Sequence, residues 1–189
     1  MTRRRFRPQR RPKKKTPATH GIRIPAIDSG RALAFAALQQ HEATGKFLHD
    51  VLRDLEQQHN LSRQERGLAI DVAAGAIRRR RTIDLLLQSQ VTRPRSEVEP
   101  DLWRILQIGV QQLCFGRTPD HAAVDATVEL TRDLQQPRWA GFVNGVLRNV
   151  ARTLTEETAH EPARNHVPLT DGIYRRLGHD VFACPLTAS

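Results

Sequence analysis

Cysteines and long apolar runs are scarce in this sequence. Only two of its 189 residues are cysteine, Cys114 and Cys184, which excludes a disulfide framework and indicates a reducing compartment. The longest apolar run, residues 32–38, is far shorter than the ~20 residues that span a bilayer, and no apolar stretch follows the basic N-terminus as in a secretory signal. We therefore expect a cytoplasmic protein with no membrane partner.

Acidic residues are absent from the first 27 positions. This segment holds ten of the 30 Lys and Arg residues, and the rest of the chain has equal numbers of basic and acidic residues. The net charge of +10 and the pI of 11.0 therefore belong to a basic arm on a neutral body, which excludes a protein that is basic over its whole surface. Four prolines and few large apolar residues predict that residues 1–27 are a disordered arm.

Motifs for catalysis are also missing. No Gly-rich phosphate loop occurs, and the eight histidines show no metal-ligand spacing. No local pattern indicates a Ser-His-Asp or Cys-His arrangement, although residues distant in sequence can still form one. Cys114 lies between Leu113 and Phe115 on a predicted apolar helix, which favours a buried, inert thiol over a nucleophile. We expect neither an enzyme nor a bound cofactor or metal.

The body, residues 28–154, has a helical apolar period throughout. The pattern predicts an all-α bundle of about seven helices around one core, with no strand. Asp28 or Ser29 is placed to cap the first helix. Ser62 and Glu65 have the spacing of a capping box, in which the Glu65 side chain accepts a hydrogen bond from the Ser62 amide. A break is expected further along that helix, near a run of arginines.

The last predicted helix has the clearest apolar stripe, residues 139–150. Phe142 lies in the middle of this stripe, so we expect it to be buried. Asn144 lies between core residues and is interpreted as a structural amide that ties two helices together, with a ligand contact as the alternative. Residues 155–189 lose the period and contain several prolines and glycines, so they are predicted to form an extended, poorly packed tail.

Two groups of cations are candidates for contact with nucleic acid, because Lys and Arg neutralise phosphates and give sequence-independent affinity. For the arm, the alternative is a solubilising role. The second group is a run of four arginines, for which the alternative is a solvated helix end whose charge offsets the helix dipole. Four successive helical positions cannot all face one surface. The first group is Arg3, Arg4, Arg5, Arg7, Arg10, Arg11, Lys13, Lys14 and Lys15, and the second is Arg78, Arg79, Arg80 and Arg81.

Four strings in the body carry a family resemblance. GFVNGVLR at 141–148 is similar to the "FVNGVL" signature of the NusB family, and AAVDATVEL at 122–130 to its "AVNEAVELA" helix. LSRQERGLA at 61–69 and GAIRRRRTID at 75–84 are similar to segments of one branch. That branch is the NusB-like N-terminal domain of small-subunit rRNA cytosine-5 methyltransferase B.

The resemblance implies a NusB-like bundle of about seven helices that binds RNA. Stand-alone antitermination factors of the family bind a leader RNA together with a ribosomal protein of the NusE type. They use the basic start of the first helix, which matches Arg31 and the arm before it. In the methyltransferases the domain is an RNA-binding appendage to a catalytic half. Phe142, Asn144 and Leu147 are the structural signature residues that the resemblance places here.

The catalytic half has no counterpart in this sequence. No Gly-rich S-adenosylmethionine motif follows the body, and Cys184-Pro185 reverses the order of the catalytic "PC" pair. Residues 168–177 resemble an interdomain connector. We expect a detached or truncated N-terminal region of an rRNA methyltransferase, which binds rRNA or leader RNA and has a separate methyltransferase half as a candidate partner. The alternatives are a stand-alone antitermination-like factor and a protein-interaction module that binds a ribosomal or transcription protein.

Overall fold

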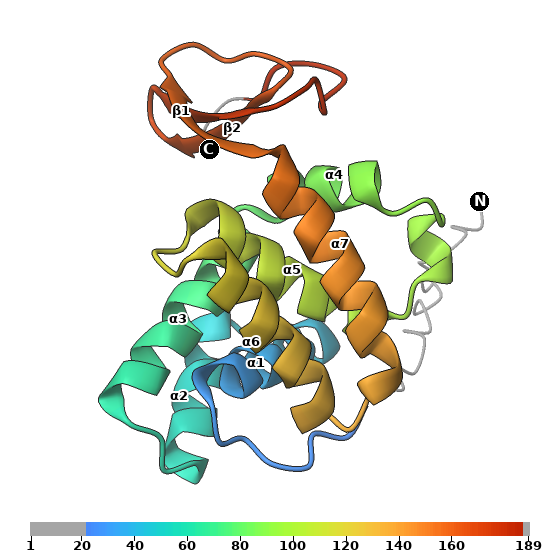
Figure 1. Cartoon of the computed structure of the whole chain (residues 1–189). Coiled ribbons are helices and arrows are strands. Elements are labelled where there is room, and N and C mark those ends of the chain that lie inside the picture. Colours follow the sequence, from blue (N-terminus) through green and yellow to red (C-terminus); the bar gives the residue numbers. More distant parts are fainter. Residues whose placement is uncertain (1–21, 187–189) are drawn as a thin grey trace, which may run out of the picture.

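Helices dominate the structure, a computed structural model that describes residues 22–186 (Figure 1). These residues form seven α-helices, two 3-10 helices and three strands. The α-helices are α1 (Gly30–Thr44), α2 (Leu48–Gln58), α3 (Arg63–Arg78), α4 (Arg80–Gln90), α5 (Pro100–Phe115), α6 (Asp120–Asp133) and α7 (Ala140–Thr153). The 3-10 helices are η1 (Arg95–Glu97) and η2 (Pro137–Trp139), and the strands are β1 (Leu154–Ala159), β2 (His166–Thr170) and β3 (Ile173–Leu177). The predicted seven-helix, all-α bundle is confirmed, with a small sheet added to it.

Local sequence signals set the ends of the first helix. The Ser29 hydroxyl accepts a hydrogen bond from the Ala32 amide at 3.2 Å, which satisfies one of the free amides in the first turn. Gly45 ends α1 in the left-handed conformation, with φ of 70°, and its amide donates to the carbonyl of His41. The predicted cap at Ser29 is therefore confirmed.

The capping box at the start of α3 is only half formed. Ser62 accepts a hydrogen bond from the Glu65 amide at 3.2 Å. The Glu65 carboxylate, however, accepts from the Gly30 amide at the start of α1, so the predicted bond to the Ser62 amide is wrong. The reason is tertiary: α1 packs closely against α3 and brings an unsatisfied helix-end amide to this carboxylate.

Helix α5 lies at the centre of the bundle, with α1, α3, α4, α6 and α7 around it. Every residue of α5 from 101 to 114 is buried. The closest approach is at Gly109, where an added methyl group would come within 2.5 Å of Leu147 Cδ1 and 3.1 Å of Thr127 Cγ2. Leu147, which is fully buried, thus fits against the bare backbone of the central helix.

The buried face of α7 is narrower than the apolar stripe in its sequence. It consists of Val143, Val146, Leu147, Val150 and Thr153. Phe142 lies at the edge of this face and is only partly buried, so the prediction of a buried Phe142 is wrong. Asn144 Oδ1 accepts a hydrogen bond at 2.9 Å from Arg148 Nε of the same helix. Within the described structure it therefore does not tie two helices together.

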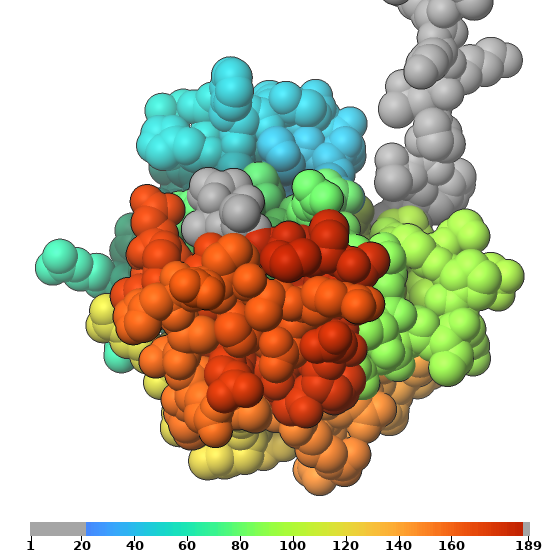
Figure 2. Space-filling model, turned by 90° about the horizontal axis from the view of Figure 1, so that it is seen from above, coloured from blue at the N-terminus to red at the C-terminus, as the bar shows by residue number. Residues whose placement is uncertain are grey.

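Residues 154–186 form a packed layer rather than the poorly packed tail that the sequence predicted. Strands β1, β3 and β2 make an antiparallel sheet in that order, and β2 and β3 are joined by a tight turn in which Gly172 has φ of 69°. Seen from above, this segment covers the end of the bundle (Figure 2). The residues that it buries are Val167, Pro168, Tyr174, Leu177, Phe182 and Leu186.

The sheet is fastened to the helices by backbone and side-chain bonds. The Gly178 amide donates to the carbonyl of Thr153, the last residue of α7, at 2.8 Å. Arg175 Nη1 donates to the carbonyl of Leu113 near the end of α5 at 3.2 Å. These strands escaped prediction because they are five or six residues long and their buried residues follow no regular alternation.

Two glycine substitutions test the packing of the central helix. Gly109→Ala should lower the free energy of unfolding by about 1–3 kcal/mol, because the new methyl group overlaps Leu147 and Thr127. Gly145→Ala is the matched control: Gly145 is on the exposed face of α7 with nothing within 4 Å of an added methyl group, so stability should rise by about 0.4–1 kcal/mol. Urea denaturation measures both changes, and equal effects would contradict the packing at Gly109.

Candidate functional site

The root of the N-terminal arm, residues 22–27, is anchored to the body. The Ile22 amide donates to Asp101 Oδ2 at 2.6 Å, and the Ile22 carbonyl accepts from Gln39 Nε2 at 3.2 Å. The side chains of Ile22, Ile24 and Ile27 pack against the core. The predicted disordered segment therefore does not extend to residue 27. The nine candidate cations from Arg3 to Lys15 lie outside the described residues.

A network of ion pairs around the buried Arg104 supports this anchor. Arg104, which is 2% exposed, forms ion pairs with Asp101 of its own helix and with Glu42 of α1, the latter at 2.7 Å. Glu42 also pairs with Arg80 Nη2 at 3.1 Å, and Arg80 Nε lies 3.9 Å from Asp84 of α4. The arm root and the exposed Arg80 are thus connected through a single chain of ion pairs.

Asp84 extends the network to the aromatic ring of Trp103. Asp84 Oδ1 accepts hydrogen bonds from Trp103 Nε1 at 2.8 Å and from Gln107 Nε2 at 2.7 Å. The guanidinium of Arg95 lies over the Trp103 ring, 4.7 Å from its centroid. Arg80 and Arg95 therefore both lie beside the arm root, a region that we call the arm-root face: Ile22, Arg80, Arg95, Asp101 and Arg104.

The four arginines at the junction of α3 and α4 point in different directions. Arg78 and Arg81 are exposed. Arg79, at the break between the helices, turns away from the arm-root face and places its guanidinium 4.4 Å from the centroid of the Phe115 ring. The expectation that the four cannot share one surface is confirmed, and only Arg80 joins the arm-root face.

Arg31 is also separate from the anchor point at Ile22. Its Nε donates to Gln112 Oε1 near the end of α5 at 2.7 Å. Arg31 precedes Gln39, which holds Ile22, by eight residues, so about 12 Å of α1 separates the two positions. The first helix therefore places its N-terminal cation and the base of the arm on different parts of the surface.

Burial affects the electrostatics of three of these arginines. It lowers the pKa of Arg31, Arg79 and Arg95, because removal from water disfavours the charged form. Carboxylates oppose the shift in each case: Glu65 near Arg31, Asp71 near Arg79, and Asp84 near Arg95. Each guanidinium has an amide oxygen or an aromatic face as partner, which compensates part of the lost hydration.

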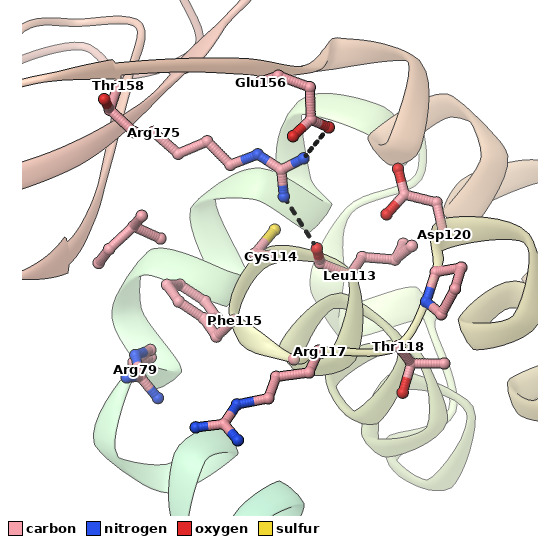
Figure 3. A pocket seen from close by; sticks show the side chains of 13 residues that line it. Arg79, Leu113, Cys114, Phe115, Arg117, Thr118, Asp120, Glu156, Thr158 and Arg175 are labelled. Atoms are coloured by element: carbon pink, nitrogen blue, oxygen red, sulfur yellow. Dashed lines mark hydrogen bonds and ion pairs between the residues drawn. The ribbon is translucent and has the colours of Figure 1, made fainter.

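Two cavities lie on either side of the loop between α5 and α6, residues 116–119. The larger has a volume of about 720 Å³ and is bounded by α5, the junction of α3 and α4, and the sheet (Figure 3). Arg79, Phe115, Arg117, Asp120, Glu156 and Arg175 contribute to its walls. The smaller, about 610 Å³, lies between α3 and α5. Sequence reasoning missed both cavities, because the residues that form them are distant along the chain.

Two features are absent from residues 22–186: a cluster of metal ligands and a membrane-spanning helix. This part of the chain contains no group of three or more His, Cys, Asp or Glu side chains placed to hold a metal ion. None of its helices has both the length and the apolar character needed to cross a bilayer.

Comparison with known families matches residues 28–152 to the NusB family model, about two thirds of the chain. The chain belongs to the NusB family. The match begins just before α1 and ends just before the last residue of α7, so it covers the whole helical bundle of the NusB domain. The sheet and the arm lie outside it.

Curated relatives of this NusB domain are methyltransferases. A putative methyltransferase of Mycobacterium tuberculosis is 32% identical over 136 residues, which cover 72% of this chain and 30% of the relative. A ribosomal RNA small subunit methyltransferase B of Salmonella arizonae is 31% identical over 137 residues, or 71% of this chain and 32% of the relative. The chain thus spans about a third of the length of these relatives.

Solved structures confirm the fold. One is a crystal structure of the antitermination factors NusB and NusE in complex with dsRNA, with a TM-score of 0.56 and 20% identity over 65% of this chain and 92% of the other. Another, a crystal structure of a plectonemic RNA supercoil, has a TM-score of 0.57 and 20% identity over 64% of this chain and 90% of that chain. At this level of identity the likeness is one of fold.

Replacing Asp101 tests the anchor of the arm root. Asp101→Ala should lower the free energy of unfolding by about 3–5 kcal/mol, because it leaves the buried Arg104 with one carboxylate partner instead of two. It should also speed hydrogen exchange of the Ile22 amide, which loses its acceptor. The exposed Asp125 of α6 gives the control variant Asp125→Ala, which should change neither quantity. Slow exchange at Ile22 in Asp101→Ala would contradict the anchor.

The two cysteines should differ sharply in reactivity. Cys114 is buried, and burial raises its pKa to about 12, whereas Cys184 is exposed. Near neutral pH a disulfide reagent should therefore label Cys184 in the native protein and both thiols after denaturation. Because the folded pKa of Cys114 is raised above 9.0, this residue's contribution to stability is present below pH 9.0 and lost as the pH rises towards 12. Rapid labelling of Cys114 in the native protein would contradict its burial.

Proposed function

We propose that this NusB domain binds RNA, with the basic arm as its main source of affinity. The observation that carries the proposal is a segment of nine cations and no carboxylate that joins the body at Ile22. Arg80, which pairs with Glu42 and Asp84, and Arg95, which lies over the Trp103 ring, add two guanidinium groups on the arm-root face. An RNA backbone that follows the arm would reach these two guanidinium groups next.

The curated relatives point to the class of RNA. They are a ribosomal RNA methyltransferase and a putative methyltransferase, and this chain corresponds to about a third of each. We infer that the domain holds ribosomal RNA for a methyltransferase half, and that its own residues supply binding rather than methyl transfer. Phosphate contacts of the arm would position the RNA, and the body would supply any selectivity.

A second candidate is a factor that acts together with a ribosomal protein. The solved structure of NusB and NusE with dsRNA supports this alternative, because its NusB chain has the same fold as this domain. In that case a partner of the NusE type would bind the bundle, and the arm would add affinity for RNA.

Salt dependence distinguishes the arm from the rest of the charged surface. Each phosphate contact with single-stranded RNA contributes ~0.7 to the slope of log affinity against log salt. Replacing Arg3, Arg4 and Arg5 together by Gln should therefore reduce the slope by about 2 and weaken binding to all RNAs alike. Filter binding at four salt concentrations, with an rRNA fragment and a random RNA of equal length, measures the slope and the selectivity.

The matched control replaces three exposed arginines of the body by Gln: Arg53, Arg132 and Arg152. It removes the same charge from α2, α6 and α7 and should leave the slope nearly unchanged. If both triple variants reduce the slope equally, the arm does not contact the RNA specifically. If neither reduces it, the protein-interaction alternative is favoured.

A further inference from the structure

The loop between α5 and α6 places one cation between two cavities. Arg117, an exposed residue of this loop, lines both the 720 Å³ and the 610 Å³ cavity, as do Phe115, Gly116 and Thr118. Within residues 22–186 Arg117 has no carboxylate oxygen within 4.0 Å. By contrast, Arg175 on the far wall pairs with Glu156 at 3.3 Å. Arg117 is thus a cation whose charge is available to a ligand.

A stacked aromatic ring forms the part of the wall next to Arg117. The half-buried Phe115 has the guanidinium of Arg79 over its ring. In Figure 3 Arg79 and Arg117 lie below Phe115, and Arg175 lies above it with its guanidinium bonded to Glu156 and to the Leu113 carbonyl. Aromatic rings and guanidinium planes are the surfaces on which unpaired bases stack, without regard to base identity.

The smaller cavity contains an unsatisfied buried acceptor. Gln111 is 2% exposed and lines this cavity, and its Oε1 has no hydrogen-bond partner. Buried polar atoms without a partner are rare, so this oxygen would gain a partner if a rotation of the Gln111 amide brought it to an N–H donor in the cavity. Every nucleobase, when unpaired, can present such a donor on its edge.

We propose that this two-cavity surface binds single-stranded RNA, with one base in the smaller cavity and the adjoining phosphate at Arg117. The base donates to Gln111 Oε1 and lies against Phe115, and the strand continues past Arg79 into the larger cavity. A polymer fits better than a free nucleotide, because a single cation lies between two cavities that would accept successive nucleotides. The inference rests on the proposed RNA binding and places a second contact away from the arm-root face.

The test uses the full chain and a short single-stranded RNA containing 4-thiouridine. Ultraviolet crosslinking should attach the RNA to the peptide that contains residues 111–117. Arg117→Gln should reduce this crosslink, because it removes the phosphate contact, and should lower the salt slope by ~0.7. The control Arg53→Gln removes the same charge from α2, which lines neither cavity, and should change neither measurement.

A second variant tests the base contact without a penalty in folding. Gln111→Leu removes a buried acceptor that has no partner, so stability to urea should not fall, while the crosslink should be lost. Crosslinks confined to other peptides, or an unchanged slope in Arg117→Gln, would overturn the site and leave the arm's RNA binding intact. Displacement of the RNA by micromolar uridine monophosphate would instead indicate a small-molecule site. Absence of any RNA binding by the wild-type chain would overturn the proposed function and this site together.

Discussion

One constraint underlies the structure. The polar side chains of the central helix α5 need hydrogen-bond or ion-pair partners, and this helix has no side that faces solvent. Helix α5 is buried from residue 101 to 114, yet it carries Asp101, Arg104, Gln107, Gln111 and Gln112. Buried polar groups without partners cost free energy, so the surrounding segments must supply those partners. The arm root, α4 and α6 each contribute one and α1 contributes three, whereas Gln111 Oε1 has none. These bonds fix where each segment lies against the central helix.

The same constraint determines where the positive charge of the arm meets the body. Asp101 holds the Ile22 backbone, and the ion pairs of Arg104 and Glu42 link that point to Arg80. Arg79 precedes Arg80 directly, but the break between α3 and α4 turns it towards Phe115 instead. Arg80 therefore lies on the arm-root face, and Arg79 lies on the surface that contains the two cavities. A single run of arginines thus contributes to two separate surfaces.

The sheet gives the bundle a wall that helices alone would not provide. The family match ends at residue 152, whereas Glu156, Thr158, Leu169 and Arg175 bound the larger cavity. Arg175 fastens this wall by donating to the Leu113 carbonyl at the end of α5, a position where backbone oxygens have no partner within the helix. The segment that resembles a connector in sequence is therefore part of the wall of the larger cavity in the fold.

The sequence alone determined the elements with local causes and a strong period. The seven helices, the cap at Ser29, the break among the arginines and the burial of Cys114 all follow from spacing of a few residues. The family resemblance rested on strings of the same kind. Tertiary structure decided the features that depend on residues distant in sequence. These are the hydrogen bond from the Gly30 amide to the Glu65 carboxylate, the anchoring of Ile22, the position of Phe142 at the edge of the buried face and the packing of the sheet. These features require groups far apart in sequence to meet, and a local pattern does not encode which unsatisfied group a side chain will reach.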